Sequence, residues 1–175
     1  MSDYSDLITT TPGLVAYWRL GEVSGNALDT SGNGYTGTVV GATYGVTGLI
    51  DADPNPAYDF DGTNDNVSFG DVLDFEHNAP FTFECRLSLD SFGGGGTDRS
   101  ILAKVNVAGA GEPGWEVRFS THQYPRLVAF PQRLVDEVER FMGVDAHVGV
   151  GVVLVLGQGE GSHGWSPVLP DAVCS

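Results

Sequence analysis

The chain has 175 residues and a mass of 18.5 kDa, which fits one domain large enough to bury a hydrophobic core. Its composition, 41% hydrophobic and 18% charged, excludes a disordered tail, and no apolar run is long enough to span a bilayer. The formal net charge of −15 would repel phosphate backbones and anionic headgroups. We therefore expect no nucleic acid partner and no membrane insertion.

Glycine and short apolar stretches favour an all-β chain. There are 25 glycines among the 175 residues, which indicates many tight turns between strands and few long helices. The two cysteines, Cys85 and Cys174, allow at most one disulfide, and their spacing matches no zinc or thioredoxin-like motif. Whether they pair, and hence the redox compartment, is left open by the sequence.

The first predicted strand, residues 14–20, follows an N-terminal extension of residues 1–11. Its alternation places Ala16, Trp18 and Leu20 on one face, with Tyr17 and Arg19 on the other. A turn-rich loop follows over residues 29–37, and a short strand follows over residues 38–40. The segments 57–60 and 66–69 read as two strands around a turn, and this pattern predicts a β-hairpin with Tyr58, Phe60, Val67 and Phe69 facing inward.

Residues 81–90 have the cleanest period of two in the chain. Phe81, Phe83, Cys85 and Leu87 alternate with polar residues, as in a strand that is buried on one face and solvated on the other. Residues 91–98 read as a flexible connection, and strands are predicted at 100–105 and 114–120.

Residues 121–175 follow a different pattern and are treated as an atypical C-terminal segment. Leu134, Val138 and Phe141 lie at helical spacing, with Pro131 suited to a first turn, and predict an amphipathic helix over residues 131–142. Residues 148–156 predict one buried strand, and the tail from residue 157 shows no periodicity.

Several stretches of the first two thirds resemble one known family. They are VAYWRLGE (15–22), DTSGNGYTG (29–37), YDFDGTNDNV (58–67), FTFE (81–84) and RSILAK (99–104). Taken in this order, they resemble the bacterial and phage type of LamG-like jelly roll domain, in the concanavalin A-like lectin/glucanase superfamily. The resemblance covers residues 12–120 approximately and implies an antiparallel two-sheet jelly roll.

The later strands of that family are not recognisable in this sequence, so the jelly roll is expected to be incomplete. A sandwich that lacks strands would expose apolar faces and unpaired edges. Two explanations stay open: residues 121–175 cover the core in another way, or they are a truncated or frame-shifted end.

Two turn-forming loops offer oxygen ligands of the kind that Ca²⁺ prefers. One contains Asp29 and Asn33, and the other contains Asp61 and Asp65. The resemblance implies a structural Ca²⁺ in such loops, whereas the residue types alone favour turn geometry.

Loop and edge aromatic residues could stack on the CH face of a sugar. The candidates are Tyr35, Tyr44, Trp115 and Tyr124, and core or edge packing is the alternative for each. No catalytic residues are identified, because the acidic run 136–139 lies on the predicted helix and no nucleophile turn is present.

The sequence therefore predicts a non-catalytic carbohydrate-binding or adhesion module that recognises a glycan or cell-surface polysaccharide. The absence of a visible Sec signal and the resemblance favour a phage virion tail or another extracellular surface. The alternatives are a structural domain that contacts other virion or surface proteins without binding glycan, and a degenerate glycoside hydrolase. The identity of the ligand and the oligomeric state are not predicted.

Overall fold

The computed structural model describes residues 3–50, 53–75, 81–89, 99–105 and 114–119, together with four later strands whose backbone pairing alone is described. One helix, α1 (Asp3–Thr9), precedes the strands in the described residues. The strands are β1 (Leu14–Trp18), β2 (Thr38–Val40), β3 (Thr43–Val46), β4 (Ala57–Phe60), β5 (Asn66–Gly70), β6 (Thr82–Arg86), β7 (Arg99–Val105), β8 (Gly114–Phe119), β9 (Pro125–Phe130), β10 (Glu139–Met142), β11 (Ala146–Val150) and β12 (Val152–Leu156). The prediction of a strand-rich chain is confirmed.

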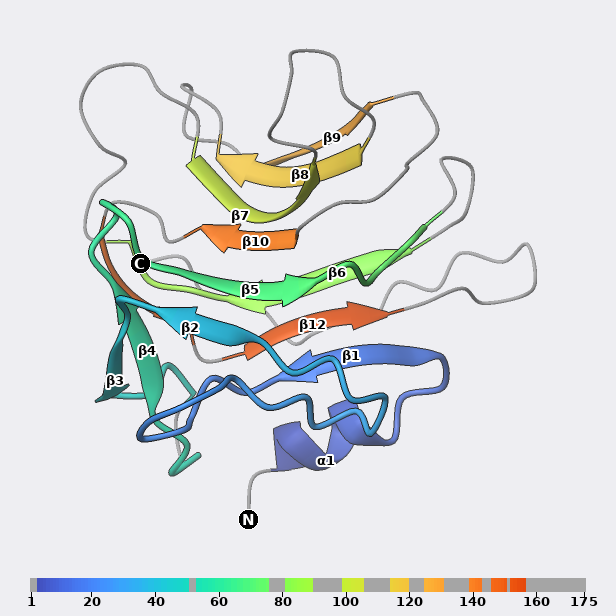
Figure 1. The fold of residues 1–175 in the computed structure, drawn as a ribbon. Helices are drawn as coiled ribbons and strands as arrows, with labels where there is room; N and C mark the ends of the chain where they lie inside the picture. The colour runs from blue at the N-terminus through green and yellow to red at the C-terminus, as the bar shows by residue number, and fades with distance from the viewer. Residues whose placement is uncertain are drawn as a thin grey trace.

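All described strand pairs are antiparallel, and they form three sheets (Figure 1). A six-stranded sheet has the order β2-β5-β10-β7-β8-β9. Two three-stranded sheets have the orders β1-β12-β6 and β11-β4-β3. The late strands β10 and β12 are therefore central, because each pairs on both sides with strands from the first two thirds of the chain.

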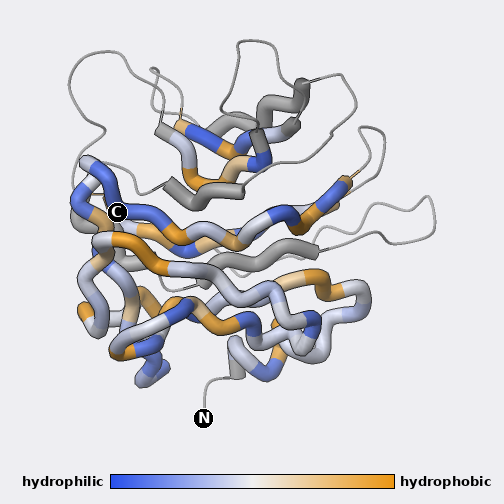
Figure 2. Tube along the Cα trace, in the orientation of Figure 1, coloured by the Kyte–Doolittle hydropathy of each residue, from blue (hydrophilic) through white to orange (hydrophobic). Residues whose placement is uncertain are grey.

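One hydrophobic core draws on strands from all three sheets. Trp18 of β1, Phe60 of β4, Phe69 of β5 and Leu102 of β7 belong to the same buried cluster. The Trp18 and Phe69 rings stack with their centroids 3.9 Å apart, which joins β1 to β5 across the two sheets that contain them. Figure 2 shows the hydrophobic and hydrophilic residues alternating along β5 and β8, as strands with one buried face require.

Helix α1 covers the opposite face of β1. Tyr17 is fully buried there and packs with Ile8, in a second small cluster to which Tyr4 and Leu14 contribute. The Tyr4 hydroxyl donates to a Glu84 carboxylate oxygen at 2.7 Å, which ties the helix to β6. The predicted register of β1 therefore holds, but the second face of this strand is buried beneath the N-terminal extension. No helix in the part of the chain described here is long and apolar enough to cross a membrane.

The prediction of a hairpin between residues 57–60 and 66–69 was wrong, although both strands exist. Strand β4 pairs with β3 and β11, whereas β5 pairs with β2 and β10. The carboxylate of Asp65 accepts a hydrogen bond from the backbone N–H of Asp61 at 3.0 Å and shapes the turn between them. This turn leads the chain from one sheet into another, so the local pattern identified the strands but not their partners.

The predicted helix over residues 131–142 was wrong at its C-terminal end, where β10 pairs with β5 and β7. Residues 131–138 lie outside the described part. The isolated segment has helical spacing, but pairing on both sides supplies backbone partners that override a weak local preference. The single strand expected over residues 148–156 is two strands, β11 and β12, which belong to different sheets.

Candidate functional site

The loop of residues 29–37, here called the Asp29 loop, is organised by one carboxylate. Oδ1 of Asp29 accepts from the backbone N–H groups of Tyr17 at 3.0 Å and Ser31 at 2.9 Å. Oδ2 accepts from the Ser31 hydroxyl at 2.8 Å and the Tyr35 N–H at 3.1 Å. Both oxygens are thus occupied by two protein donors each, and the loop is fixed against β1.

Asn33 closes the same loop from its other side. Its side-chain amide donates to the backbone carbonyl of Val15 at 2.7 Å. Asp29 and Asn33 therefore both act on the backbone around β1, which agrees with the turn-geometry interpretation of these residues. Calcium binding by Asp29 and Asn33 stays a prediction.

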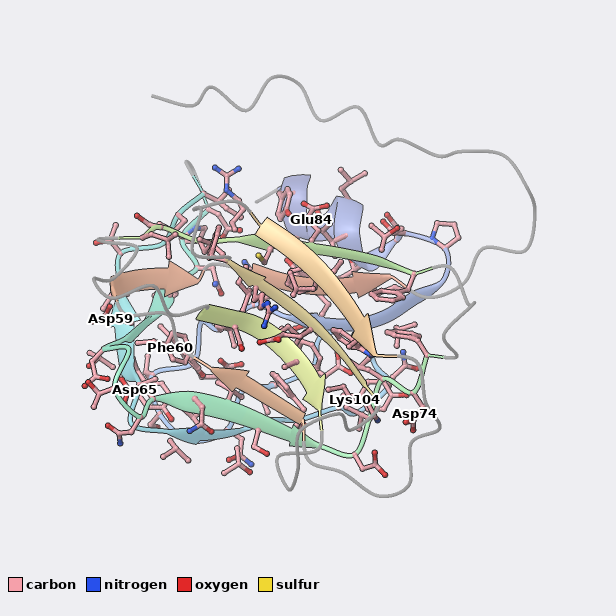
Figure 3. The ribbon with its side chains drawn as sticks, turned by 90° about the horizontal axis from the view of Figure 1, so that it is seen from above. Asp59, Phe60, Asp65, Asp74, Glu84 and Lys104 are labelled. Carbon is pink, nitrogen blue, oxygen red and sulfur yellow. The ribbon has the colours of Figure 1, made fainter. Side chains whose placement is uncertain are left out.

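The turn of residues 61–65 holds the other predicted metal ligands. Asp61 Oδ1 accepts from the Thr63 N–H at 2.8 Å, and Asp65 is 9% exposed with its carboxylate oriented into the turn. Figure 3 places Asp65 at the opposite end of the molecule from Lys104. Among the described residues, no group of three or more His, Cys, Asp or Glu side chains could hold a metal ion. Calcium binding by this turn stays a prediction.

Replacing Asp29 by alanine is expected to lower the free energy of unfolding by about 3 kcal/mol, because the buried Tyr17 N–H and two further backbone donors lose their acceptor. Chemical denaturation of Asp29→Ala in EDTA and in millimolar calcium measures the loss, with Asp6→Asn on the exposed side of α1 as a control. We expect the same loss in both buffers. A loss confined to the calcium buffer would restore Asp29 as a metal ligand.

Melting curves of the unchanged protein test the turn 61–65 separately. A ligand that binds only the folded state raises the melting temperature by mass action. If the turn binds Ca²⁺, calcium raises the melting temperature relative to EDTA, and Asp61→Asn removes that increase. A melting temperature that is the same in calcium and EDTA would leave Asp61 and Asp65 with a turn-forming role alone.

The four aromatic candidates have different surroundings. Trp115 is 4% exposed and packs against Phe75 and Phe81, so its ring belongs to the core. Tyr35 is half-buried against the main core, and its carbonyl accepts from the Trp18 indole N–H at 2.5 Å. Tyr44 is half-buried at the edge strand β3, and Tyr124 lies outside the described residues. Tyr35 and Tyr44 are therefore the described candidates that are partly exposed.

Tyr44 belongs to a surface that the sequence did not single out. Its hydroxyl donates to the Gly25 carbonyl at 2.6 Å, and its ring meets Tyr58 edge-on with centroids 4.7 Å apart. Gly25 lies in the loop of residues 21–28, here called the Glu22 loop. Glu22 accepts from the Leu28 N–H at 3.0 Å and from the Tyr58 hydroxyl at 2.5 Å, so the loop is held at both ends and in the middle.

The Glu22 loop exposes large apolar side chains in spite of being fixed. Val23 is 81% exposed and Leu28 is 55% exposed, and the polar residues Ser24 and Asn26 between them are also exposed. Burial and the Glu22 carboxylate raise the pKa of Tyr58, so this tyrosine keeps its proton and acts as a hydrogen-bond donor. The loop thus presents a preorganised surface of mixed apolar and polar character beside the Tyr44 ring.

The Cys85 thiol of β6 packs against the main core. Burial, with a smaller contribution from Glu84, raises the pKa of the Cys85 thiol to about 12. A thiol with this pKa is protonated at neutral pH and is a poor nucleophile. Searches for similar proteins returned no matching family model, curated protein or solved structure.

The sequence identified Tyr44 but not the Glu22 loop, and the reason is structural. Ser24, Gly25 and Asn26 signal a turn, and a turn alone says nothing about what holds it. The hydrogen bonds that fix the loop come from Tyr44 in β3 and Tyr58 in β4, which are distant in sequence. In the sequence, the available signal was a valine at position 23 directly before this turn.

Proposed function

We propose that the protein is a non-catalytic carbohydrate-binding or adhesion module, with the Glu22 loop and Tyr44 as its ligand-contacting surface. The observation that carries the proposal is the fixed loop, which exposes Val23 and Leu28 beside a partly exposed tyrosine ring. A sugar has apolar CH faces and polar hydroxyls, and this surface offers groups suited to both. Since the loop is already held by three hydrogen bonds, binding costs little ordering entropy.

The same proposal includes a jelly roll of the LamG-like type. In this arrangement the six-stranded sheet and the sheet β1-β12-β6 are the two layers of a sandwich. The shared core supports this interpretation, because Trp18 of β1 and the inward residues of β6 pack in the same cluster as Phe69 of β5. The sequence resemblance over residues 12–120 supports it independently, as it supports a location on a virion tail or another extracellular surface.

Replacing Tyr44 by alanine is expected to reduce glycan binding at least tenfold, because the ring is lost and the hydrogen bond to Gly25 is lost with it. Tyr44→Phe is the matched variant: it keeps the ring and removes the hydroxyl, so binding should fall less. A glycan array identifies a ligand, and calorimetric titration of the three proteins with that ligand measures the affinities.

Failure to bind any glycan, together with self-association that depends on Val23, would favour the assembly alternative. In that case the exposed Val23 and Leu28 would contact a protein partner. Equal affinities for all three proteins toward an identified glycan would place the ligand elsewhere on the molecule.

A further inference from the structure

One asparagine of the chain is followed by glycine, and the pair lies in the Asp29 loop. The chain has seven asparagines, and Asn33 alone precedes a glycine, Gly34. Both residues are exposed, and a Cβ added to Gly34 would meet no described atom within 4 Å. Because glycine has no Cβ, its backbone nitrogen can approach the side-chain carbonyl carbon of the preceding asparagine without obstruction. The pair is therefore a candidate for intramolecular cyclisation.

The attacking nitrogen has no hydrogen bond to break. The Gly34 carbonyl accepts from the Thr36 N–H at 2.9 Å, but no hydrogen bond from the Gly34 N–H is found among the described residues. Asn26 provides the contrast within the same chain, because it is also exposed but is followed by Ala27. Ala27 carries a Cβ, and its N–H donates to the Gly37 carbonyl at 2.8 Å. Attack by the Ala27 nitrogen would require that hydrogen bond to break.

The carboxamide of Asn33 fastens the Asp29 loop to β1. Its Nδ2 donates to the Val15 carbonyl at 2.7 Å, and the Leu14 carbonyl oxygen lies 3.4 Å from the same nitrogen. A carboxamide nitrogen donates hydrogen bonds, whereas an ionised carboxylate only accepts them. A carboxylate at position 33 would place an anionic oxygen against these two carbonyl oxygens, so repulsion would replace the hydrogen bond that holds the loop.

We propose that Asn33 and Gly34 form a site of spontaneous covalent modification, at which conversion of Asn33 to aspartate or isoaspartate releases this side of the Asp29 loop from β1. The Gly34 nitrogen loses its proton to hydroxide and bonds to the side-chain carbonyl carbon of Asn33. The bond from that carbon to Nδ2 breaks, and the leaving nitrogen takes a proton from water and departs as ammonia. Water then opens the resulting cyclic imide at either carbonyl, so the net reaction consumes water and releases ammonia.

The structure indicates how far the modification reaches. The strong hydrogen bond of the Asn33 carboxamide lies at the protein surface, so its opening slows the reaction by about fivefold and does not prevent it. Asp29 still accepts from the Tyr17 N–H after the conversion, so one side of the loop is released while the other stays fixed. This inference goes beyond the proposed glycan binding, because it depends on the chemistry of the chain itself.

Incubation of the folded wild-type protein in mildly alkaline buffer made with heavy-oxygen water tests the proposal. Proteolysis in ordinary water and mass spectrometry then locate the heavy oxygen, which enters only at asparagines that convert during the incubation. We expect Asn33 to be labelled at least about tenfold faster than Asn26 in the same sample. Gly34 is left unchanged, because its φ of 84° favours glycine and alanine there would strain the loop.

Two variants test the structural consequence. Asn33→Asp reproduces the aspartate product and removes the hydrogen bond to Val15. Asn26→Asp is the matched control, because it adds the same charge at an exposed asparagine whose side chain makes no hydrogen bond in the part of the chain that the structure describes. We expect Asn33→Asp to have a melting temperature about 3 °C below that of Asn26→Asp.

Each outcome decides for or against the modification site. Faster labelling of Asn33, together with the lower melting temperature of Asn33→Asp, supports it. Equal labelling of Asn33 and Asn26, or no labelling of Asn33, overturns it, and this measurement requires no variant to fold. Equal melting temperatures of the two variants would overturn the release of the loop from β1. Glycan binding through Tyr44 is decided separately, by the titrations of the Tyr44 variants.

Discussion

Replacing both Asp71 and Asp74 by asparagine is expected to lower the free energy of unfolding by about 3 kcal/mol, because the buried ammonium of Lys104 loses two carboxylate partners. The side chain of Lys104 is fully buried, and its ammonium lies 2.9 Å from Asp71 Oδ1 and 2.6 Å from Asp74 Oδ1. The ammonium also donates to the Val72 carbonyl at 2.6 Å. Figure 3 shows Lys104 and Asp74 at the same end of the molecule.

The matched variant is Lys104→Met, which removes the buried charge and keeps most of the side-chain volume. Asp71 and Asp74 are 54% and 66% exposed, so water can solvate them when the ammonium is gone. Leaving the Val72 carbonyl without this donor costs about 1–2 kcal/mol. Urea denaturation followed by circular dichroism should therefore show that the double asparagine variant has a lower free energy of unfolding than Lys104→Met. If Lys104→Met were the less stable variant, the cost would not come from a buried ammonium that has lost its carboxylate partners.

Replacing Trp18 by alanine is expected to cost about 3–5 kcal/mol of unfolding free energy. The side chain is fully buried, its ring stacks on Phe69, and its indole N–H donates to the Tyr35 carbonyl at 2.5 Å. Removing it would open a cavity between β1 and β5 and release the Asp29 loop. Trp18→Phe should cost less, because it keeps the stacking and loses the hydrogen bond. Thermal and urea denaturation measure the stability of both variants. A decrease of less than 1 kcal/mol in the unfolding free energy of Trp18→Ala would contradict the shared core.

The strands were predictable because their faces differ in solvation. In and after β6, Thr82, Arg86 and Ser88 are exposed, whereas Phe83, Cys85 and Leu87 pack against the core, as the period of two predicts. Glu84 departs from the pattern and is half-buried, because α1 covers that side of β6 and Tyr4 binds its carboxylate. Alternation predicts which residues of a strand face the core, but it does not predict which element covers the other face.

Strand partners were not predictable because they depend on contacts between distant segments. Residues 57–60 and 66–69 are close in sequence and separate into different sheets, whereas β12 pairs with β1 across most of the chain. The error at residues 139–142 has the same origin, since a helical spacing was overridden by pairing with β5 and β7. Local pattern determines the face of a strand, and long-range pairing determines its neighbours.

Part of the candidate site could be predicted from the sequence. The turn residues of the Asp29 loop follow from residue types, and the structure shows the hydrogen bonds through which Asp29 shapes that turn. Tyr44 is half-buried on the edge strand β3. The Glu22 loop depends on Tyr58, whose ring is in the core while its hydroxyl reaches the Glu22 carboxylate. A residue that serves the core and a surface loop at once leaves no separate signal in the sequence.

Amide chemical shifts of the ¹⁵N-labelled protein, titrated with the best neutral ligand from the glycan array, test the central claim most directly. Binding at the proposed surface should shift the amides of Val23, Ser24, Asn26 and Leu28, together with that of Tyr44. Tyr44→Ala should abolish these shifts while the spectrum stays that of a folded protein. Shifts confined to other strands, with the Glu22 loop unchanged, would contradict the account.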